Sequence, residues 1–464
     1  AGILHYNMKW LDDDKGKQKK GAFLKSIWLQ TCAYLYTNKI KPTMLEWSCP
    51  GSMMEADINE LDKIYNSLCK LTPIVGAKTT LAYHQNAVTE AEAVCSYALS
   101  QNFGLNSSNM FLGIDVGGST SDILLLAKDS DNGNKATLYR ESSVRLAAGV
   151  FFNAVIKSDT FRQALLSFHE GHKTNVYVSN IKEILTEPSK APYFLNSIFD
   201  QLKTTEDYEE FYGSIDVNAK FVFTIPAYVT GMLLYYSGML IGKTIKAEHL
   251  ERISRVDVLS FGKGGRLFHW LINSAGVRAT REYYADCLNA GVRMVVGKEL
   301  EVVYRDEIAE DNKAEVAKGL CDPKELEKKA FSSESDICGE SGVKYIMANG
   351  APKELQAEDE LTGDYFANEM NNFDFSGIEN FEKFMNIFLD FVSVKTHLYP
   401  QADNALRNDL ADLPNRIASY ICNNDTEYRK ARKSEDGSFH YHQPLIIAEG
   451  VCFLDTLIKK VFDQ

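Results

Sequence analysis

Residues 110–128, MFLGIDVGGSTSDILLLAK, contain the pattern that most constrains the fold of this chain. An apolar run ending at Asp115 meets the turn GGST at residues 117–120, and a second apolar run follows at residues 123–126. Two such runs on either side of a glycine turn predict a β-hairpin. The sequence therefore predicts two neighbouring antiparallel strands joined by a tight turn.

The residue types at this turn suit a phosphate group and a hydrated cation. Glycines let the backbone approach a ligand, and their N–H groups favour anions. Asp115 and Asp122 flank the turn and are candidate holders of a hydrated magnesium ion. Taken alone, the motif is better explained as a tight hairpin with two solvated aspartates, so the other motifs decide between the two interpretations.

Length, composition and charge indicate a multidomain globular protein and argue against a nucleic-acid partner. The chain has 464 residues, which favours two or three domains, and its 45% hydrophobic and 24% charged residues are typical of a globular protein. A net charge of −13 argues against a nucleic-acid partner, since phosphate binding needs clustered Lys and Arg. The basic run at residues 15–20 is expected to be a solvated loop.

Nine cysteines occur singly with no CxxC pair, which favours a reducing compartment and a cytoplasmic location. No apolar run is expected to reach the roughly 18 residues of a membrane span, and the N-terminus has no signal-peptide pattern. We therefore expect no membrane partner.

A second glycine turn lies far along the chain. Residues 256–261 predict a buried strand that runs into Gly262-Lys-Gly-Gly265 and then into a helix at residues 266–274. A strand followed by a glycine turn and a helix is an arrangement that can bind a phosphate or a nucleotide, because the amides of the turn and the helix N-terminus point the same way.

Periodicity predicts an alternation of helices and strands elsewhere. Strands are expected at residues 45–50 and 136–146, and residues 332–341 and 354–375, the latter rich in acids, are expected to form exposed loops or an insertion. Helices are expected at residues 23–36, 56–71, 88–99, 147–152, 226–241, 309–320, 381–392 and 446–462.

Three motifs together carry a resemblance to a known family. Glu90-Ala-Glu-Ala93 on a helix, the turn after Asp115 about 25 residues later, and Gly262 to Arg266 about 145 residues beyond that resemble the actin, sugar-kinase and heat-shock-chaperone ATPase superfamily. The heat-shock chaperone branch is the most similar. In that pattern the motifs are the connecting helix, the phosphate-2 loop and the adenosine loop. Residues 148–152 and 313–319 are similar to two further stretches of the family, and the match covers roughly residues 20–320.

The resemblance implies ATP and magnesium as cofactors and gives each residue a role. Asp115 would hold the magnesium-bound water, Glu90 would help to order the hydration shell of the metal as a second catalytic residue, and Arg266 would stack on the adenine. Nucleotide-binding residues would be Gly117, Gly118, Ser119, Thr120, Gly262, Lys263, Gly264, Gly265 and Arg266. The chain departs from the family at Lys263, where a small residue is usual, so base recognition is expected to be altered.

The resemblance also implies an α/β fold with duplicated RNase-H-like halves around a nucleotide cleft. Because no phosphate-1 loop precedes the connecting helix, the first half is expected to be incomplete and this chain to be a poor ATPase. The expected domains are the rest of the first lobe at residues 1–110, the second lobe at 111–320 with a helical subdomain at 157–250, and a mostly helical extension with an acidic insertion at 321–464.

The function expected is ATP binding and hydrolysis that switch the conformation of a chaperone-like or actin-like protein, with a protein client as partner. One alternative is a scaffold that keeps the fold without turnover. Another is a sugar or small-molecule kinase, which is disfavoured because residues 129–255 supply no second DxGG loop.

Overall fold

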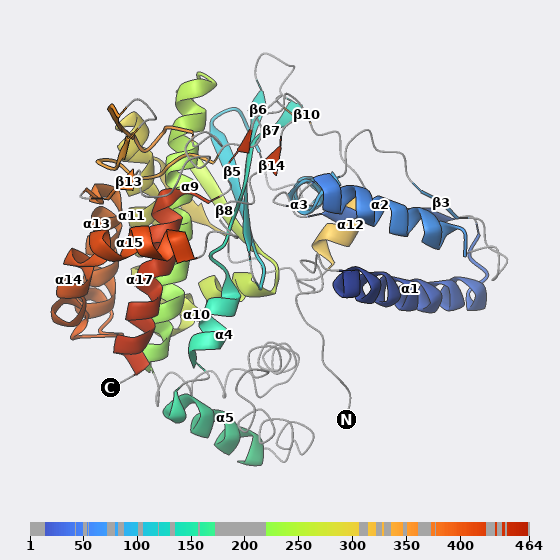
Figure 1. The fold of residues 1–464 in the computed structure, drawn as a ribbon, viewed down its shortest axis with the longest axis horizontal. Coiled ribbons are helices and arrows are strands. Elements are labelled where there is room, and N and C mark those ends of the chain that lie inside the picture. Colours follow the sequence, from blue (N-terminus) through green and yellow to red (C-terminus); the bar gives the residue numbers. More distant parts are fainter. Residues whose placement is uncertain are drawn as a thin grey trace.

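A mixed sheet lies at the centre of the fold in the computed structural model (Figure 1). The structure describes residues 14–41, 43–49, 53, 55–71, 79–81, 88–100, 105–118, 120–129, 135–155, 158–171, 220–305, 314–321, 327–328, 336–346, 350–360, 373–375, 377–423, 432–433, 439–440 and 443–462. The sheet has six strands in the order β10-β7-β6-β5-β8-β9. The chain is therefore a mixed α/β protein, as expected from its sequence.

The predicted hairpin is confirmed. β5 (Asn109–Val116) and β6 (Ser121–Asp129) pair antiparallel, with Asp115 directly opposite Asp122. β7 (Lys135–Val144) continues the meander on the far side of β6.

Parallel strands complete the sheet. β8 (Arg255–Phe261) pairs parallel with β5, β9 (Glu301–Tyr304) pairs parallel with β8, and the short β10 (Glu327–Lys328) pairs parallel with β7. The carboxyl ends of β5 and β8 consequently lie at the same edge of the sheet.

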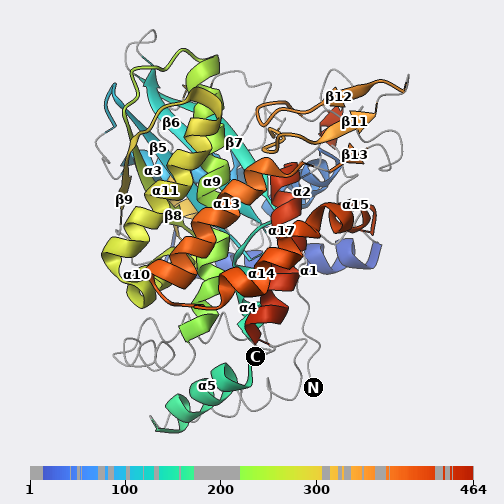
Figure 2. The ribbon, with the colours of Figure 1, turned by 90° about the vertical axis from the view of Figure 1, so that its left-hand side faces the viewer.

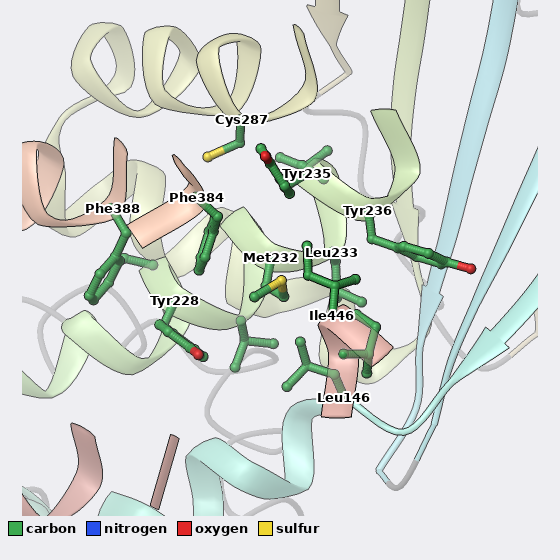
Figure 3. Close-up of a cluster of buried hydrophobic side chains, with 14 of the residues drawn as sticks. Leu146, Tyr228, Met232, Leu233, Tyr235, Tyr236, Cys287, Phe384, Phe388 and Ile446 are labelled. Carbon is green, nitrogen blue, oxygen red and sulfur yellow. The ribbon is translucent and has the colours of Figure 1, made fainter. Parts of the chain in front are cut away.

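A thick layer of helices covers one face of the sheet (Figures 1 and 2). At its centre is α9 (Thr224–Ala247), which shares one continuous apolar core with the inward side chains of β5 and β6. Figure 3 shows Tyr228 packed against Phe384 and Phe388, whose ring centroids lie 5.5 and 5.2 Å from its own. The helices that pack around α9 are α4 (Ala148–Val155), α10 (Arg266–Ala275), α11 (Val277–Val296), α13 (Glu379–Leu389) and α17 (Leu445–Phe462).

By length and composition α9, with the residues just before it, could cross a membrane, so the expectation that no such stretch exists is wrong. The apolar region runs on beyond residues 226–241, where the sequence pattern placed its ends. Its most apolar window is buried entirely inside the protein, and Tyr228 donates a hydrogen bond to the Gly450 carbonyl (2.9 Å). The apolarity of α9 is therefore explained by its place in the core.

The other face carries a thinner layer. α3 (Glu90–Ser100) lies on the side chains of β5, β6 and β8 that point away from α9, and α12 (Glu315–Cys321) crosses α3 (Figure 1). Beyond them lie α1 (Asp14–Thr37) and α2 (Glu55–Cys69).

The N-terminal part differs from expectation at its basic run. Residues 15–20 belong to α1 instead of a loop, and Lys20 is buried. Two short parallel pairs form here, β1 (Thr43–Leu45) with β3 (Thr79–Leu81) and β2 (Ser48–Cys49) with β4 (Val88–Thr89). In sequence, β1 and β2 lie between α1 and α2, and β3 and β4 lie between α2 and α3.

Part of the expected exposed insertion is buried. Residues 336–340 are covered by protein, so the prediction that residues 332–341 form an exposed loop is wrong in its exposure for this part. Glu340 is fully buried, and its carboxylate accepts hydrogen bonds from the amides of Ser341 (2.7 Å), Asn380 (2.8 Å) and Phe381 (2.9 Å). Burial, together with the charge of the neighbouring Glu340, raises the pKa of Glu449 well above its ordinary value. A charged residue in a polar run thus caps α13 from a distance.

The remaining described elements are short or peripheral. The helix expected near residues 381–392 is confirmed as α13 with a π-helical continuation, Asp390–Lys395, and the helix expected at 446–462 is confirmed as α17. The others are α5 (Asp159–Gly171), η3 (Lys220–Phe223), η4 (Lys263–Gly265), β11 (Lys344–Ile346), β12 (Pro352–Glu354), β13 (Phe373–Asp374), α14 (Ala402–Ala411), α15 (Leu413–Asn423), β14 (Arg432–Lys433) and β15 (Phe439–His440).

Asp257 holds the amino ends of the central strands together. Its buried carboxylate accepts hydrogen bonds from Asn109 Nδ2 (2.9 Å), Arg255 Nη2 (2.7 Å) and Arg305 Nε (3.0 Å). Burial alone would raise the pKa of Asp257, but the hydrogen bonds from Arg255 and Asn109 and the charge of Arg305 bring this pKa below its ordinary value. The carboxylate thus contributes stability that is present above about pH 4 and is lost as the pH falls through the lower pKa of the folded state.

We expect Asp257→Asn to lower the free energy of unfolding by about 2 kcal/mol at pH 7, because two arginines lose their shared anion. Urea unfolding should show this difference shrinking as the pH is lowered from 5 to 3. Asp403→Asn is the matched control, since Asp403 makes an exposed pair with Arg407 and should cost less than about 0.5 kcal/mol. An equal loss for Asp257→Asn at both ends of the pH range would contradict this role.

The crossing of α12 over α3 depends on a glycine. A Cβ at Gly319 would lie 1.7 Å from the Ala93 carbonyl oxygen, so the helix backbones touch at this point. Gly319→Ala must push the two helices apart, and we expect a loss of roughly 2 kcal/mol or more in urea unfolding. Gly21→Ala, in open space on α1, is the control and should stabilise the protein by up to about 1 kcal/mol. Tolerance of alanine at Gly319 would show that this crossing is loose.

Candidate functional site at the carboxyl edge of the sheet

The two predicted glycine turns lie next to each other. In the parallel pairing of β5 with β8, the last residue pair is Asp115 with Phe261, so the turn at 117–120 and the turn at 262–265 leave the sheet at the same edge. A Cβ at Gly262 would lie only 2.1 Å from Asp115 Oδ1. The carboxylate of the first motif therefore rests directly against the backbone of the second.

Glycine is required at two positions of the second turn. Gly262 has φ +68°, a conformation that other residues rarely adopt. At Gly264, a Cβ would approach the Val116 carbonyl oxygen to 2.5 Å and the Ala148 Cβ to 2.7 Å. The second turn is thus packed against the end of β5 and the start of α4 at the same time.

The first turn is held by the N-terminus of α4. The Gly117 amide donates to the Thr120 carbonyl (2.8 Å), which closes the turn. The amides of Ala148 and Gly149 donate to the carbonyls of Gly117 (3.1 Å) and Gly118 (3.0 Å). These first amides of α4 are therefore used to fix the turn. Ser119 lies outside the described residues.

Polar side chains form a row across three strands on the α3 face of this edge. Asp115 on β5 is half-buried, and Asp122, opposite it on β6, is 5% exposed. Ser143 on β7 is opposite Asp122 and is 8% exposed. Residues directly opposite each other in antiparallel strands point to the same side of the sheet, so these three side chains are neighbours. Sequence reasoning singled out both aspartates but missed Ser143, which belongs to no motif.

The N-terminus of α3 lies close to this row. Thr89 and Glu92 form a capping box, since the Thr89 amide donates to Glu92 Oε2 (2.7 Å) and the Glu92 amide donates to Thr89 Oγ1 (3.1 Å). The Thr89 hydroxyl also donates to Glu141 Oε2 (3.1 Å) on β7. Glu141 precedes Ser143 by two residues on the same face, about 7 Å along the strand.

Glu90, the first residue of α3, therefore lies near the level of the row. It is half-buried. Burial raises the pKa of Tyr65 on α2, and the charge of the nearby Glu90 raises it further. The catalytic role expected for Glu90 stays a prediction.

The remaining predicted residues lie at the start of α10. Lys263 is half-buried, whereas Arg266 is 7% exposed and is largely covered by protein. The Gly265 amide donates to the Gly262 carbonyl (3.2 Å). An adenine could therefore meet only the small exposed part of the Arg266 side chain in this conformation, and the stacking role stays a prediction.

The carboxylates at this edge of the sheet suit a cation that keeps most of its bound water. Among the described residues, no group of three or more Asp, Glu, His or Cys side chains is placed to hold a metal ion. Two carboxylates, Asp115 and Asp122, fit the usual binding of magnesium, which takes one or two carboxylates and several waters.

No model of a known protein family matches this chain, and no curated protein sequence matches it. No relative therefore supplies an activity or a site residue. The resemblance to the actin, sugar-kinase and heat-shock-chaperone ATPase superfamily rests on the motifs quoted above.

The contact between Gly262 and Asp115 can be tested by adding a methyl group. Gly262→Ala requires a positive φ and places Cβ against the carboxylate, so we expect a loss of about 2 kcal/mol or more in the free energy of unfolding. Gly118→Ala is the matched control in the other turn, where a Cβ meets nothing within 4 Å, and it should change stability by less than about 1 kcal/mol. Similar values for the two variants would mean that the two turns are not packed together.

Proposed function

We propose that this chain binds a magnesium nucleotide, with ATP as the ligand, at the carboxyl edge of β5 and β8. The fold would be that of the actin-like ATPases, with two RNase-H-like halves of which the first is incomplete, and the described sheet would be the core of the second half. Nucleotide binding would switch the arrangement of the two lobes, and hydrolysis by this chain would be poor.

One observation carries the proposal. Two glycine turns about 145 residues apart in sequence, each with the residue types of a phosphate or nucleotide loop, meet with the Asp115 carboxylate against Gly262. The two glycine turns that the sequence predicted as ligand-binding would rarely meet at the same edge of one sheet by chance. Ligands of α/β sheets bind at the carboxyl ends of the strands, which is where both turns lie.

The order of the strands also supports it. An antiparallel meander, β7-β6-β5, is extended by the parallel strands β8 and β9, which the chain reaches through helices. In the family that the chain resembles, the third strand is followed by a glycine and a helix, and here β7 is followed by Gly149 and α4. The close crossing of α12 over α3 brings together residues 90–93 and 313–319, two of the stretches that carry the resemblance.

Each residue of the two turns would then have a role in binding the nucleotide or the magnesium ion. The Gly117 and Gly118 turn would approach the phosphates, since these positions carry no side chain. Asp115 and Asp122 would hold the magnesium through its waters, which neutralises phosphate charge. The turn at 262–265 would contact the nucleoside side of the same ligand, because it touches Asp115 from the other strand.

Calorimetry on the full chain tests the proposal. We expect saturable heat with ATP and magnesium, and we expect Asp115→Asn to weaken the magnesium-dependent binding about tenfold or more, which is about 1.4 kcal/mol. Asp403→Asn, an exposed change on α14, should bind as the unmodified protein does. Absence of heat at millimolar ATP with magnesium would remove the proposal.

A further inference from the structure

Ser143 is one of several buried side chains that have a polar atom without a hydrogen-bond partner among the described residues, and it lies directly opposite Asp122 of the candidate site. Its side chain is 8% exposed, and its Oγ makes no hydrogen bond there. A buried hydroxyl without a partner costs free energy, and such groups in folded proteins usually meet a water or an ion. A water or an ion on its side of the sheet would supply the missing partner of Ser143 Oγ.

The neighbouring serine shows which side that is. Ser142 Oγ donates to the carboxylate of Asp336 on the face that α9 covers, and Tyr236 on α9 hydrogen-bonds the same carboxylate. Successive strand residues point to opposite faces, so Ser143 points to the α3 face. There it lies opposite Asp122, which itself lies opposite Asp115.

The geometry points to Ser143 as a third binding residue of a site for one hydrated divalent cation, formed with Asp122 and Asp115 and able to hold the ion before nucleotide binds. This inference rests on the magnesium part of the proposed function and adds to it a residue and an order of binding. Two carboxylates side by side repel each other, and a cation between them removes that repulsion. The hydroxyl oxygen accepts from the waters of the ion or ligates it directly, as hard oxygen ligands do.

The row also explains why three carboxylates are not needed. Magnesium dehydrates reluctantly and retains several waters, so an uncharged hydroxyl beside two carboxylates can orient the water shell. Glu141, which the Thr89 hydroxyl bonds, is two residues from Ser143 on the same strand. The cation would thus lie close to the strand position that holds the N-terminus of α3.

Binding of Mn²⁺, as a probe for Mg²⁺, to the full chain without nucleotide tests the inference. The amount of free Mn²⁺ is measured by electron paramagnetic resonance, and Mg²⁺ is added to displace the bound ion. We expect one saturable site, about tenfold weaker binding in Ser143→Ala, and binding within about threefold of the unmodified protein in Ser143→Thr, which keeps the hydroxyl. Ser143→Asp, with a third carboxylate, should bind more tightly.

Ser142→Ala is the matched control, because it removes the same atom one residue away on the opposite face, and it should leave Mn²⁺ affinity unchanged. Circular dichroism confirms folding of every variant. Equal affinity of Ser143→Ala and the unmodified protein overturns the inference, as does the absence of a saturable site in the unmodified protein. If ATP binds in calorimetry but Mn²⁺ alone does not, this inference fails and the proposed function stands. If Mn²⁺ binds through Ser143 but ATP does not, the cation site stands and the nucleotide proposal fails.

Discussion

The parallel pairing of β5 with β8 is the interaction on which the candidate site depends. It joins segments about 146 residues apart, from Asn109 with Arg255 to Asp115 with Phe261. At the amino end the buried Asp257 carboxylate gathers two arginines and an asparagine, and at the carboxyl end Gly262 packs against Asp115. A shift of register by one residue would turn Asp115 to the α9 face and separate the two turns.

The two faces of the sheet differ in how firmly they are packed. On one face α9 and α11 touch backbone to backbone, since a Cβ at Gly238 would lie 2.0 Å from the Leu288 carbonyl oxygen. That face is one continuous core with the C-terminal helices α13 and α17. The face that carries Asp115 and Asp122 is covered chiefly by α3 and α12 around a much smaller apolar cluster. The candidate site thus lies on the face of the sheet that has the thinner cover of helices and the smaller apolar cluster.

Local sequence patterns predicted the two glycine turns of the site but not that they lie next to each other. The hairpin at 110–128 and the strand, turn and helix at 256–274 are strong short-range signals, and both are confirmed. Their contact is long-range, so only the resemblance suggested it. Ser143 could not be predicted as a site residue from the sequence. A serine in a strand with alternating polar and apolar residues does not stand out until the structure shows that it pairs with Asp122. Glu340 could not be found either, since a charged residue in a polar stretch reads as exposed unless the amides that bind it are seen. The loop predicted at residues 15–20 is wrong for a similar reason. The basic first turns of α1 show no helical spacing of apolar residues, so the burial of Lys20 could not be expected from the sequence.

Hydrogen–deuterium exchange of the full chain, with and without ATP and magnesium, tests most directly whether one ligand bridges the two turns. Joint binding predicts slower exchange in peptides covering residues 113–120 and 260–268 together, and loss of both effects when magnesium is removed. Protection of only one of these peptides, or of neither while protection appears elsewhere, would contradict the view that β5 and β8 build a single nucleotide site.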